Sequence, residues 1–213
     1  MLLLQGVWVR ILFVAILLVL LVGCSTTPDT VFSHPLDELP KRADYRILPQ
    51  ESTVLWTTQT LDGQERRGFV AMDQGIVRID DRQIVSSTLV FDMDSFTVSR
   101  GPFDLHVYMN DYDYFDTFYY PEAQFSLRSL ELQEDGSYDL RGTLEIVEIT
   151  REVEMDAELF QKGKYFALRG QLPVDVLRWG IVQNQSSTYK ELADTERIQD
   201  ELMLNIEWVF EKT

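Results

Sequence analysis

The strongest constraint on the fold of this chain is a two-residue alternation of apolar and polar side chains that recurs from about residue 44 onward. In the clearest example, residues 153–159, every second side chain is apolar and the side chains between them are acidic. This period places the apolar side chains together on one face of a β-strand. The same period recurs over residues 89–93, 138–146 and 202–210, so the chain predicts several half-buried strands.

Short turn motifs separate the predicted strands. The Asp-Gly pair at 135–136 and the Lys-Gly-Lys sequence at 162–164 are typical of hairpin turns, and the Asp-Gly pair at 62–63 is a weaker example. The alternation that begins at Phe125 slips near Ser129, as a β-bulge would make it. Repeated short strands joined by hairpins indicate an antiparallel all-β domain, either a meander sandwich or a closed barrel.

Two short segments are expected to be helical instead. One lies within residues 104–113. The other follows Thr188, because Thr188 and Glu191 have the spacing of a helix capping box.

The composition excludes several classes of protein. The chain has 19 Lys and Arg against 35 Asp and Glu, a formal net charge of −16, which excludes a basic nucleic-acid binder. Its one cysteine, Cys24, and two histidines, His34 and His106, leave no intramolecular disulfide and no cysteine or histidine zinc cage. No cofactor is therefore expected from the composition.

The N-terminal region predicts the cell envelope as the compartment. Arg10 precedes an uninterrupted apolar run over residues 11–22, and the segment Leu-Val-Gly-Cys that ends at Cys24 resembles the lipobox of bacterial lipoproteins. Residues 1–23 are therefore interpreted as a lipoprotein signal peptide, and Cys24 as the site of lipid attachment, for example of palmitate. The alternatives are an uncleaved membrane anchor and an ordinary signal peptide.

Residues 24–43 are expected to form the acylated cysteine and a flexible linker, because they hold three of the seven prolines and lack an apolar period. His34 is then a solvated linker side chain. Residues 44–213 form the folded domain. Ser25, rather than an aspartate after Cys24, favours a periplasm-facing position on the outer membrane in a Gram-negative cell.

No motif of a common enzyme class is present. The acidic residues Asp111, Asp113 and Asp116 could bind Ca²⁺, but Phe115 and Asp116 stand where a loop of EF-hand type needs its third carboxylate and its glycine. Neither a metal site nor a catalytic residue is therefore predicted. A carboxylate pair suitable for a glycosidase is uninformative among 35 acidic residues. His106 is interpreted as a helix-face or core residue rather than a general base.

Several weak motifs follow one another over about residues 45–210. They are Tyr45-x-Ile47-x-Pro49 with Ser52, Val54 and Trp56; Gly68-Phe69; Gly75; residues 87–96; Tyr114-Phe115-Asp116; Tyr120-Pro121 with Phe125; residues 142–150; and Arg178-Trp179-Gly180. Their order and spacing resemble those of the YceI-like family. Three features depart from the family pattern: Tyr108-Met109 replaces the family's His-Leu pair, Glu145 and Glu148 replace its Thr and Gly, and residues 183–199 form a longer segment of unassigned role.

The resemblance implies an all-β fold, an eight-stranded antiparallel lipocalin-like barrel with one or two short helices, whose members are thought to hold isoprenoid chains or isoprenoid quinones. A barrel of this size is wide enough either to be filled by side chains or to hold one small ligand. The inward-facing, candidate ligand-binding residues are Trp56, Phe69, Phe91, Tyr114, Phe115, Phe125, Leu144, Ile146 and Trp179. Ordinary core packing is the alternative for each of them.

A tyrosine-rich segment suits the mouth of such a barrel, because a phenol combines an apolar ring with a hydrogen-bonding tip. Its members are Tyr108, Tyr112, Tyr114, Tyr119 and Tyr120. A connector packed on the barrel end is the alternative interpretation.

The expected function is a membrane-tethered lipoprotein, not an enzyme, that binds or carries an amphiphilic isoprenoid in its barrel. The alternative is a structural or interaction lipoprotein with a packed barrel and an acidic surface for a protein partner. A hydrolase with paired carboxylates is a third hypothesis. Neither nucleic acid nor metal is an expected partner.

Overall fold

The computed structural model describes residues 40–101, 103–183, 187–193 and 195–213. The interpretations of residues 1–23, Cys24 and His34 lie outside the described residues. The strands are β1 (Arg42–Ile47), β2 (Thr53–Gln59), β3 (Glu65–Asp80), β4 (Gln83–Arg100), β5 (Glu122–Leu132), β6 (Tyr138–Ile146), β7 (Ile149–Lys162), β8 (Tyr165–Asp175) and β9 (Glu201–Lys212). The helices are α2 (Phe103–Asn110) and α3 (Ser187–Glu191), and the 3₁₀ segments are η1 (Pro49–Glu51) and η2 (Val176–Trp179).

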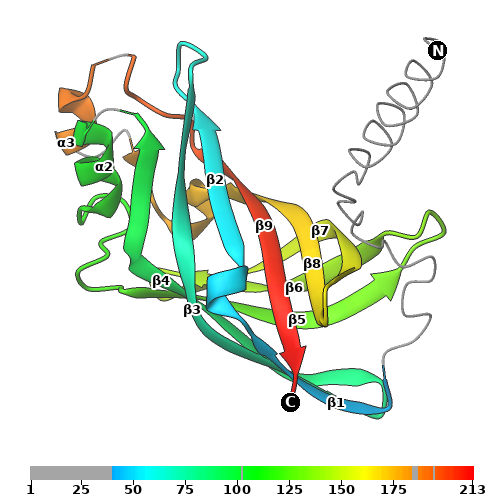
Figure 1. Ribbon diagram of the computed structural model, residues 1–213. Helices are drawn as coiled ribbons and strands as arrows, with labels where there is room; N and C mark the ends of the chain where they lie inside the picture. Colours follow the sequence, from blue (N-terminus) through cyan, green and yellow to red (C-terminus); the bar gives the residue numbers. More distant parts are fainter. Residues whose placement is uncertain (1–39, 102, 184–186, 194) are drawn as a thin grey trace, which may run out of the picture. The chain divides into compact units, whose positions relative to one another are not determined.

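The strands form a closed antiparallel barrel (Figure 1). The sheet runs in the order β3-β2-β9-β8-β7-β6-β5-β4, and β4 pairs back with β3. β1 and β2 occupy the same place in the sheet, because β2 pairs with the first parts of β3 and β9 and β1 pairs with their last parts. The barrel is therefore eight-stranded, with its first strand interrupted by η1, and the predicted fold class is confirmed.

The interruption between β1 and β2 is fastened by Ser52. Its hydroxyl accepts a hydrogen bond from the Val209 N–H at 2.9 Å and donates one to the Leu48 carbonyl at 2.9 Å. The Leu48 N–H also donates to the Val209 carbonyl at 2.8 Å. Val209 is consequently fully buried on the outer face of the barrel, beside Phe160 and Ala167.

The predicted turns and the predicted bulge are confirmed. Gly63, Gly136 and Gly163 all have positive φ at the tips of hairpins, a conformation that glycine adopts without strain. The register between β5 and β6 shifts between Leu127 and Ser129. These local features follow from short-range chemistry that the sequence displays directly.

The helix predicted within residues 104–113 corresponds to α2. The predicted start of the second helix is wrong, because α3 begins at Ser187 and ends at Glu191, so Thr188 lies inside it rather than capping it. No helix in the described ranges is long and apolar enough to cross a bilayer.

The barrel has two different ends. The open end comprises the start of β1, the end of β9 and the hairpins at residues 81–82, 133–137 and 163–164. The closed end comprises the hairpin at 60–64, α2 with the loop at 111–121, η2 and α3. Figure 1 shows β1 and the C-terminus far from α2 and α3. The two ends differ in their packing, as described next.

Candidate ligand-binding site

An uncharged cavity lies inside the open end of the barrel. It encloses about 80 Å³, and about 650 Å³ when gaps between atoms and the part open to solvent are included. Its lining comes from β1, β3, β4, β5, β7, β8 and β9. The lining residues are Pro40, Tyr45, Val77, Ile79, Ile84, Leu89, Leu127, Leu130, Leu159, Phe166, Ala167, Leu168, Trp208 and Phe210.

The cavity lies where two neighbouring strands diverge. β4 and β5 pair only over residues 89–92 and 122–125, although both strands continue toward the open end. Beyond Leu89 the Leu127 N–H donates instead to the Ser87 hydroxyl at 3.1 Å. Ile84, Leu127 and Leu130 are therefore only half-buried, and the cavity opens to solvent at this end.

Trp208 forms the floor of the cavity and packs against two rings that are not part of the lining. Trp208 is almost fully buried, and its ring centroid lies 5.1 Å from that of Phe125 and 6.4 Å from that of Phe91. The Trp208 Nε1–H is buried without a hydrogen-bond partner among the described residues. A buried donor without a partner favours any acceptor that reaches it.

Tyr45 stands at the rim, where its ring packs edge-on against Phe166 with the centroids 5.9 Å apart. Burial raises the pKa of the Tyr45 phenol above its ordinary value. The hydroxyl therefore stays protonated at neutral pH and can donate a hydrogen bond to a ligand head group.

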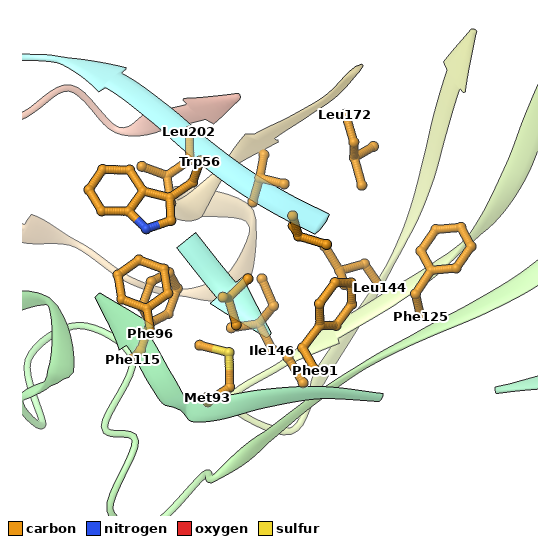
Figure 2. Packing of buried hydrophobic residues seen from close by; sticks show 14 of the residues in the cluster. Trp56, Phe91, Met93, Phe96, Phe115, Phe125, Leu144, Ile146, Leu172 and Leu202 are labelled. Atoms are coloured by element: carbon orange, nitrogen blue, oxygen red, sulfur yellow. The ribbon is translucent and has the colours of Figure 1, made fainter. Parts of the chain in front are cut away.

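The closed end is filled by a continuous run of aromatic rings, called the aromatic plug below. Successive ring centroids lie 5.2, 5.0, 4.6, 5.2 and 5.5 Å apart. The plug consists, in order, of Trp56, Phe96, Phe115, Tyr114, Tyr108 and Tyr189. Figure 2 shows Trp56, Phe96 and Phe115 packed together, apart from Phe125.

Two of the three tyrosines in the plug carry buried hydroxyls that lack a partner among the described residues, whereas the Tyr189 hydroxyl donates to the Ile198 carbonyl at 3.3 Å. The hydroxyls of Tyr108 and Tyr114 have no hydrogen-bond partner within the described part of the chain. Burial, reinforced by nearby groups such as Asp200, raises the pKa of both phenols above the ordinary tyrosine value. Both groups are therefore neutral core residues at physiological pH.

The structure places the predicted ligand-binding residues mostly in the packed core. Trp56, Phe91, Tyr114, Phe115, Phe125, Leu144, Ile146 and Trp179 are all buried inside the barrel, as expected for inward-facing residues. None of them lines the cavity. Trp179, for example, donates from Nε1 to the Leu144 carbonyl at 3.2 Å. Their contact with a ligand stays a prediction.

The inward orientation predicted for Phe69 is wrong, because its side chain is 45% exposed on the outer face. The inward position of β3 opposite Trp56 belongs to Gly68. A Cβ there would come within 2.6 Å of the Trp56 indole, so the ring itself fills the space of the absent side chain. The neighbouring Phe69 must then point outward.

The tyrosine-rich segment does not form the mouth of the cavity, and that interpretation is also wrong. Tyr108 and Tyr114 are buried in the plug, whereas Tyr112 and Tyr119 are exposed on the closed end. The cavity lies at the opposite end. The sequence pattern places lining residues such as Leu159 and Phe210 on the apolar faces of their strands. A period of two shows which face of a strand is apolar, but it does not show at which end of the barrel a residue lies.

In the part of the chain that the structure describes, no three His, Cys, Asp or Glu side chains gather as a metal site would require. Asp111 instead accepts the Tyr112 N–H at 2.8 Å and supports the turn after α2. His106 lies on α2, where its Nδ1 is 3.3 Å from Nδ2 of Asn110.

Comparison with known proteins supports the same fold. The family profile of the YceI-like domain matches residues 45–210. The chain belongs to the YceI-like family. This family assignment confirms the resemblance carried by the sequence motifs.

Two solved structures illustrate the relationship. The crystal structure of Burkholderia cenocepacia BcnA superposes with a TM-score of 0.58 at 20% identity, covering 76% of this chain and 98% of that chain. A Campylobacter jejuni YCEI protein gives a TM-score of 0.45 at 18% identity, covering 68% of this chain and 80% of that chain. A comparison with curated proteins found no match.

Proposed function

We propose that this YceI-like protein is a membrane-tethered lipoprotein that binds an amphiphilic isoprenoid, a polyisoprenoid or an isoprenoid quinone, in the open end of its barrel. The observation that carries the proposal is the cavity, whose lining has no charged side chain. Burying a prenyl chain there gains roughly 25 cal/mol per Å² of apolar surface. Membership of a family of binding proteins rather than enzymes supports it.

The cavity must widen to take a long chain. Its enclosed volume of about 80 Å³ is smaller than the roughly 300–1,000 Å³ of pockets that bury drug-sized ligands. Beyond Leu89, β4 and β5 share no ladder pairs. These two strands can therefore separate around a ligand without breaking the regular hydrogen bonds of the sheet.

The alternative is an interaction lipoprotein whose barrel is solid. The closely packed plug and the net charge of −16 favour a packed scaffold with an acidic surface for a protein partner. The two functions differ in whether the purified protein binds prenyl chains at all.

Titration with isoprenoid alcohols tests the binding function. Full-length protein freed of lipid by organic extraction should bind longer chains more tightly, because each added unit buries more apolar surface. Leu130→Trp fills the cavity and should weaken binding at least tenfold. Leu55→Trp, on the exposed face of β2, is the matched control and should bind like the wild type. No binding by the wild type, or equal affinity for short and long chains, would favour the solid barrel.

The tether is tested separately at Cys24. Two or more acyl chains hold a protein stably on a membrane, whereas one binds only marginally. Cys24→Ser should move the protein out of the membrane fraction or leave an uncleaved precursor. Mass spectrometry of the mature wild type that showed an unmodified residue 24 would contradict the lipoprotein assignment.

A further inference from the structure

The cavity and the start of the barrel lie at the same end of the domain. Pro40 belongs to the cavity lining, and β1 begins at Arg42, which pairs with Asp80 beside the hairpin at the open end. The chain from Cys24 to Pro40 spans sixteen residue steps, which can reach at most about 55 Å. A lipid on Cys24 would therefore hold the open end near the bilayer.

The closed end lies much farther from this attachment point. β3 runs from the closed-end hairpin to the open-end hairpin over 16 residues, or about 50 Å along the strand. Because barrel strands are tilted, this corresponds to roughly 40 Å along the barrel axis. To bring the closed end equally near the bilayer, the tether would have to extend over most of its length along the barrel. Chain length alone thus favours the open end as the side nearer the lipid.

The distribution of lysine agrees with this orientation. Four of the five lysines, Lys41, Lys162, Lys164 and Lys212, lie at the open end, and only Lys190 lies at the closed end. Lys162 is paired with Glu207 at 2.9 Å, whereas Lys41, Lys164 and Lys212 are exposed.

The two ends also differ in net charge, although the closed end carries basic side chains as well, among them Arg66 and Arg178. Asp81, Glu134 and Asp135 also lie at the open end, so its charges roughly balance within a chain of net charge −16. The closed end has Asp111, Asp113 and Asp116 in a single loop. An anionic lipid surface attracts each nearby basic residue by about 1 kcal/mol and repels acidic ones.

The rim of the open end is also apolar. Val85 is 55% exposed next to Ile84, and Leu132 is partly exposed beyond Leu130. Tyr45 adds an amphipathic ring of the kind found at membrane interfaces. An apolar rim with lysines around it fits a lipid headgroup region.

The closed end offers a competing surface, because Phe118 is 83% exposed beside Tyr119. The acidic residues of the same loop make that surface unsuitable for an anionic bilayer.

We infer that the open end of the barrel docks on the bilayer that carries the lipid tether, so that the cavity takes its ligand directly from that bilayer. The inference rests on the proposed function, since it requires the Cys24 tether and an apolar ligand.

Energy transfer from the two ends of β3 to the bilayer tests the orientation. Acylation consumes the Cys24 thiol, so a fluorophore can be attached selectively to Leu61→Cys at the closed end or Gln83→Cys at the open end, both exposed positions. The acylated full-length protein is reconstituted in vesicles of phosphatidylethanolamine and phosphatidylglycerol that contain a rhodamine lipid. Transfer from position 83 should clearly exceed transfer from position 61, because the two positions lie at opposite ends of β3, at most about 50 Å apart.

Each outcome of this experiment is decisive. Equal transfer, or stronger transfer from position 61, would overturn the inferred orientation, while isoprenoid titration could still uphold the binding function. Protein that fails to float with the vesicles would overturn the tether and the inference together. Circular dichroism establishes that both labelled variants are folded.

Charge reversal tests the lysines at the open end. The Lys41→Glu/Lys164→Glu variant should take up a fluorescent isoprenoid alcohol from the same vesicles several-fold more slowly than the wild type. Its affinity for that alcohol in detergent solution should be unchanged. Lys190→Glu at the closed end is the matched control and should behave like the wild type. Equal uptake by all three proteins would overturn the inference.

Discussion

Two buried indoles mark the two halves of the barrel interior. Trp56 Nε1 donates to the Thr97 carbonyl at 3.0 Å and its ring stacks on Phe96, so every part of this side chain is used in packing. Trp208 is equally buried, but its Nε1–H lacks a partner within the described residues and its side chain lines the cavity. Burial alone therefore does not distinguish a core residue from a ligand contact.

Replacing each indole should separate these two roles. Trp56→Phe removes a buried hydrogen bond and leaves a void, so the free energy of unfolding in urea should fall by about 1–3 kcal/mol. Its affinity for isoprenoid alcohols should stay unchanged. Trp208→Phe should change that affinity, because it alters the cavity floor. Weakened binding by Trp56→Phe at unchanged stability would instead restore the ligand-binding role predicted for Trp56.

The two buried phenols predict a loss of stability at alkaline pH. Because burial raises the pKa of Tyr108 and Tyr114, the unfolded chain releases these protons above pH of about 10 while the folded protein retains them. Each phenol should thus remove about 1.4 kcal/mol of stability per pH unit above that point. In Tyr108→Phe/Tyr114→Phe the free energy of unfolding should fall less steeply with pH.

At neutral pH the same double variant should be at least as stable as the wild type, because each lost hydroxyl lacks a hydrogen-bond partner in the described residues. Urea unfolding at several pH values measures both effects. An alkaline slope identical to that of the wild type would show that the two hydroxyls reach water.

At most positions the sequence correctly predicted which apolar residues face the barrel interior. Phe69 is the exception, and its outward orientation has a physical reason. Phe69 is a typical strand residue, but Gly68 takes the inward position because Trp56 fills the space beside it. Whether a glycine on one strand lies opposite a large ring on the next depends on the register between the two strands. A single strand does not display that register.

At the scale of elements, the interruption between β1 and β2 depends on one hydroxyl. Ser52→Ala would leave the Val209 N–H without its hydrogen bond on the outer face of the barrel. We expect the free energy of unfolding to fall by about 1–3 kcal/mol. Ser99→Ala, which loses only an exposed hydrogen bond to the Arg67 carbonyl, is the control and should change stability much less. Similar losses in both variants would contradict this role of Ser52.

Strands, hairpins and the bulge near Ser129 could be predicted because each depends on neighbouring residues. The position of the cavity could not. It arises where β4 and β5 stop pairing beyond Leu89, and this pairing joins segments far apart in the sequence. The composition of the tyrosine-rich loop therefore predicts a position at the mouth, although the connection through α2 places the loop at the closed end.

For the whole molecule, folding should be independent of metal ions. Residues 40–213 contain no cysteine and one histidine, and the described side chains form no cluster of three metal-ligating groups. A chelator should therefore leave the thermal midpoint of unfolding unchanged. A fall of many degrees would revive Asp111, Asp113 and Asp116 as a Ca²⁺ ligand set.

Removing the ligand, unlike removing metal ions, should lower the thermal midpoint of unfolding. A ligand that binds only the folded barrel stabilises it by mass action. At a free concentration of 100 times Kd the gain is about 2.7 kcal/mol. For a domain of this size that corresponds to a rise in the thermal midpoint of about 5–11 °C. The rise should grow with prenyl chain length at a fixed ligand concentration, because longer chains bury more apolar surface and bind more tightly.

The filled-cavity variant shows whether this stabilisation comes from the open end. On addition of isoprenoid alcohol, the thermal midpoint of Leu130→Trp should rise by about half as much as that of the wild type or less, whereas Leu55→Trp should respond like the wild type. Equal rises in both variants would mean that the alcohol binds elsewhere on the molecule. That result would favour the alternative function, in which the barrel is packed and its acidic surface binds a protein partner.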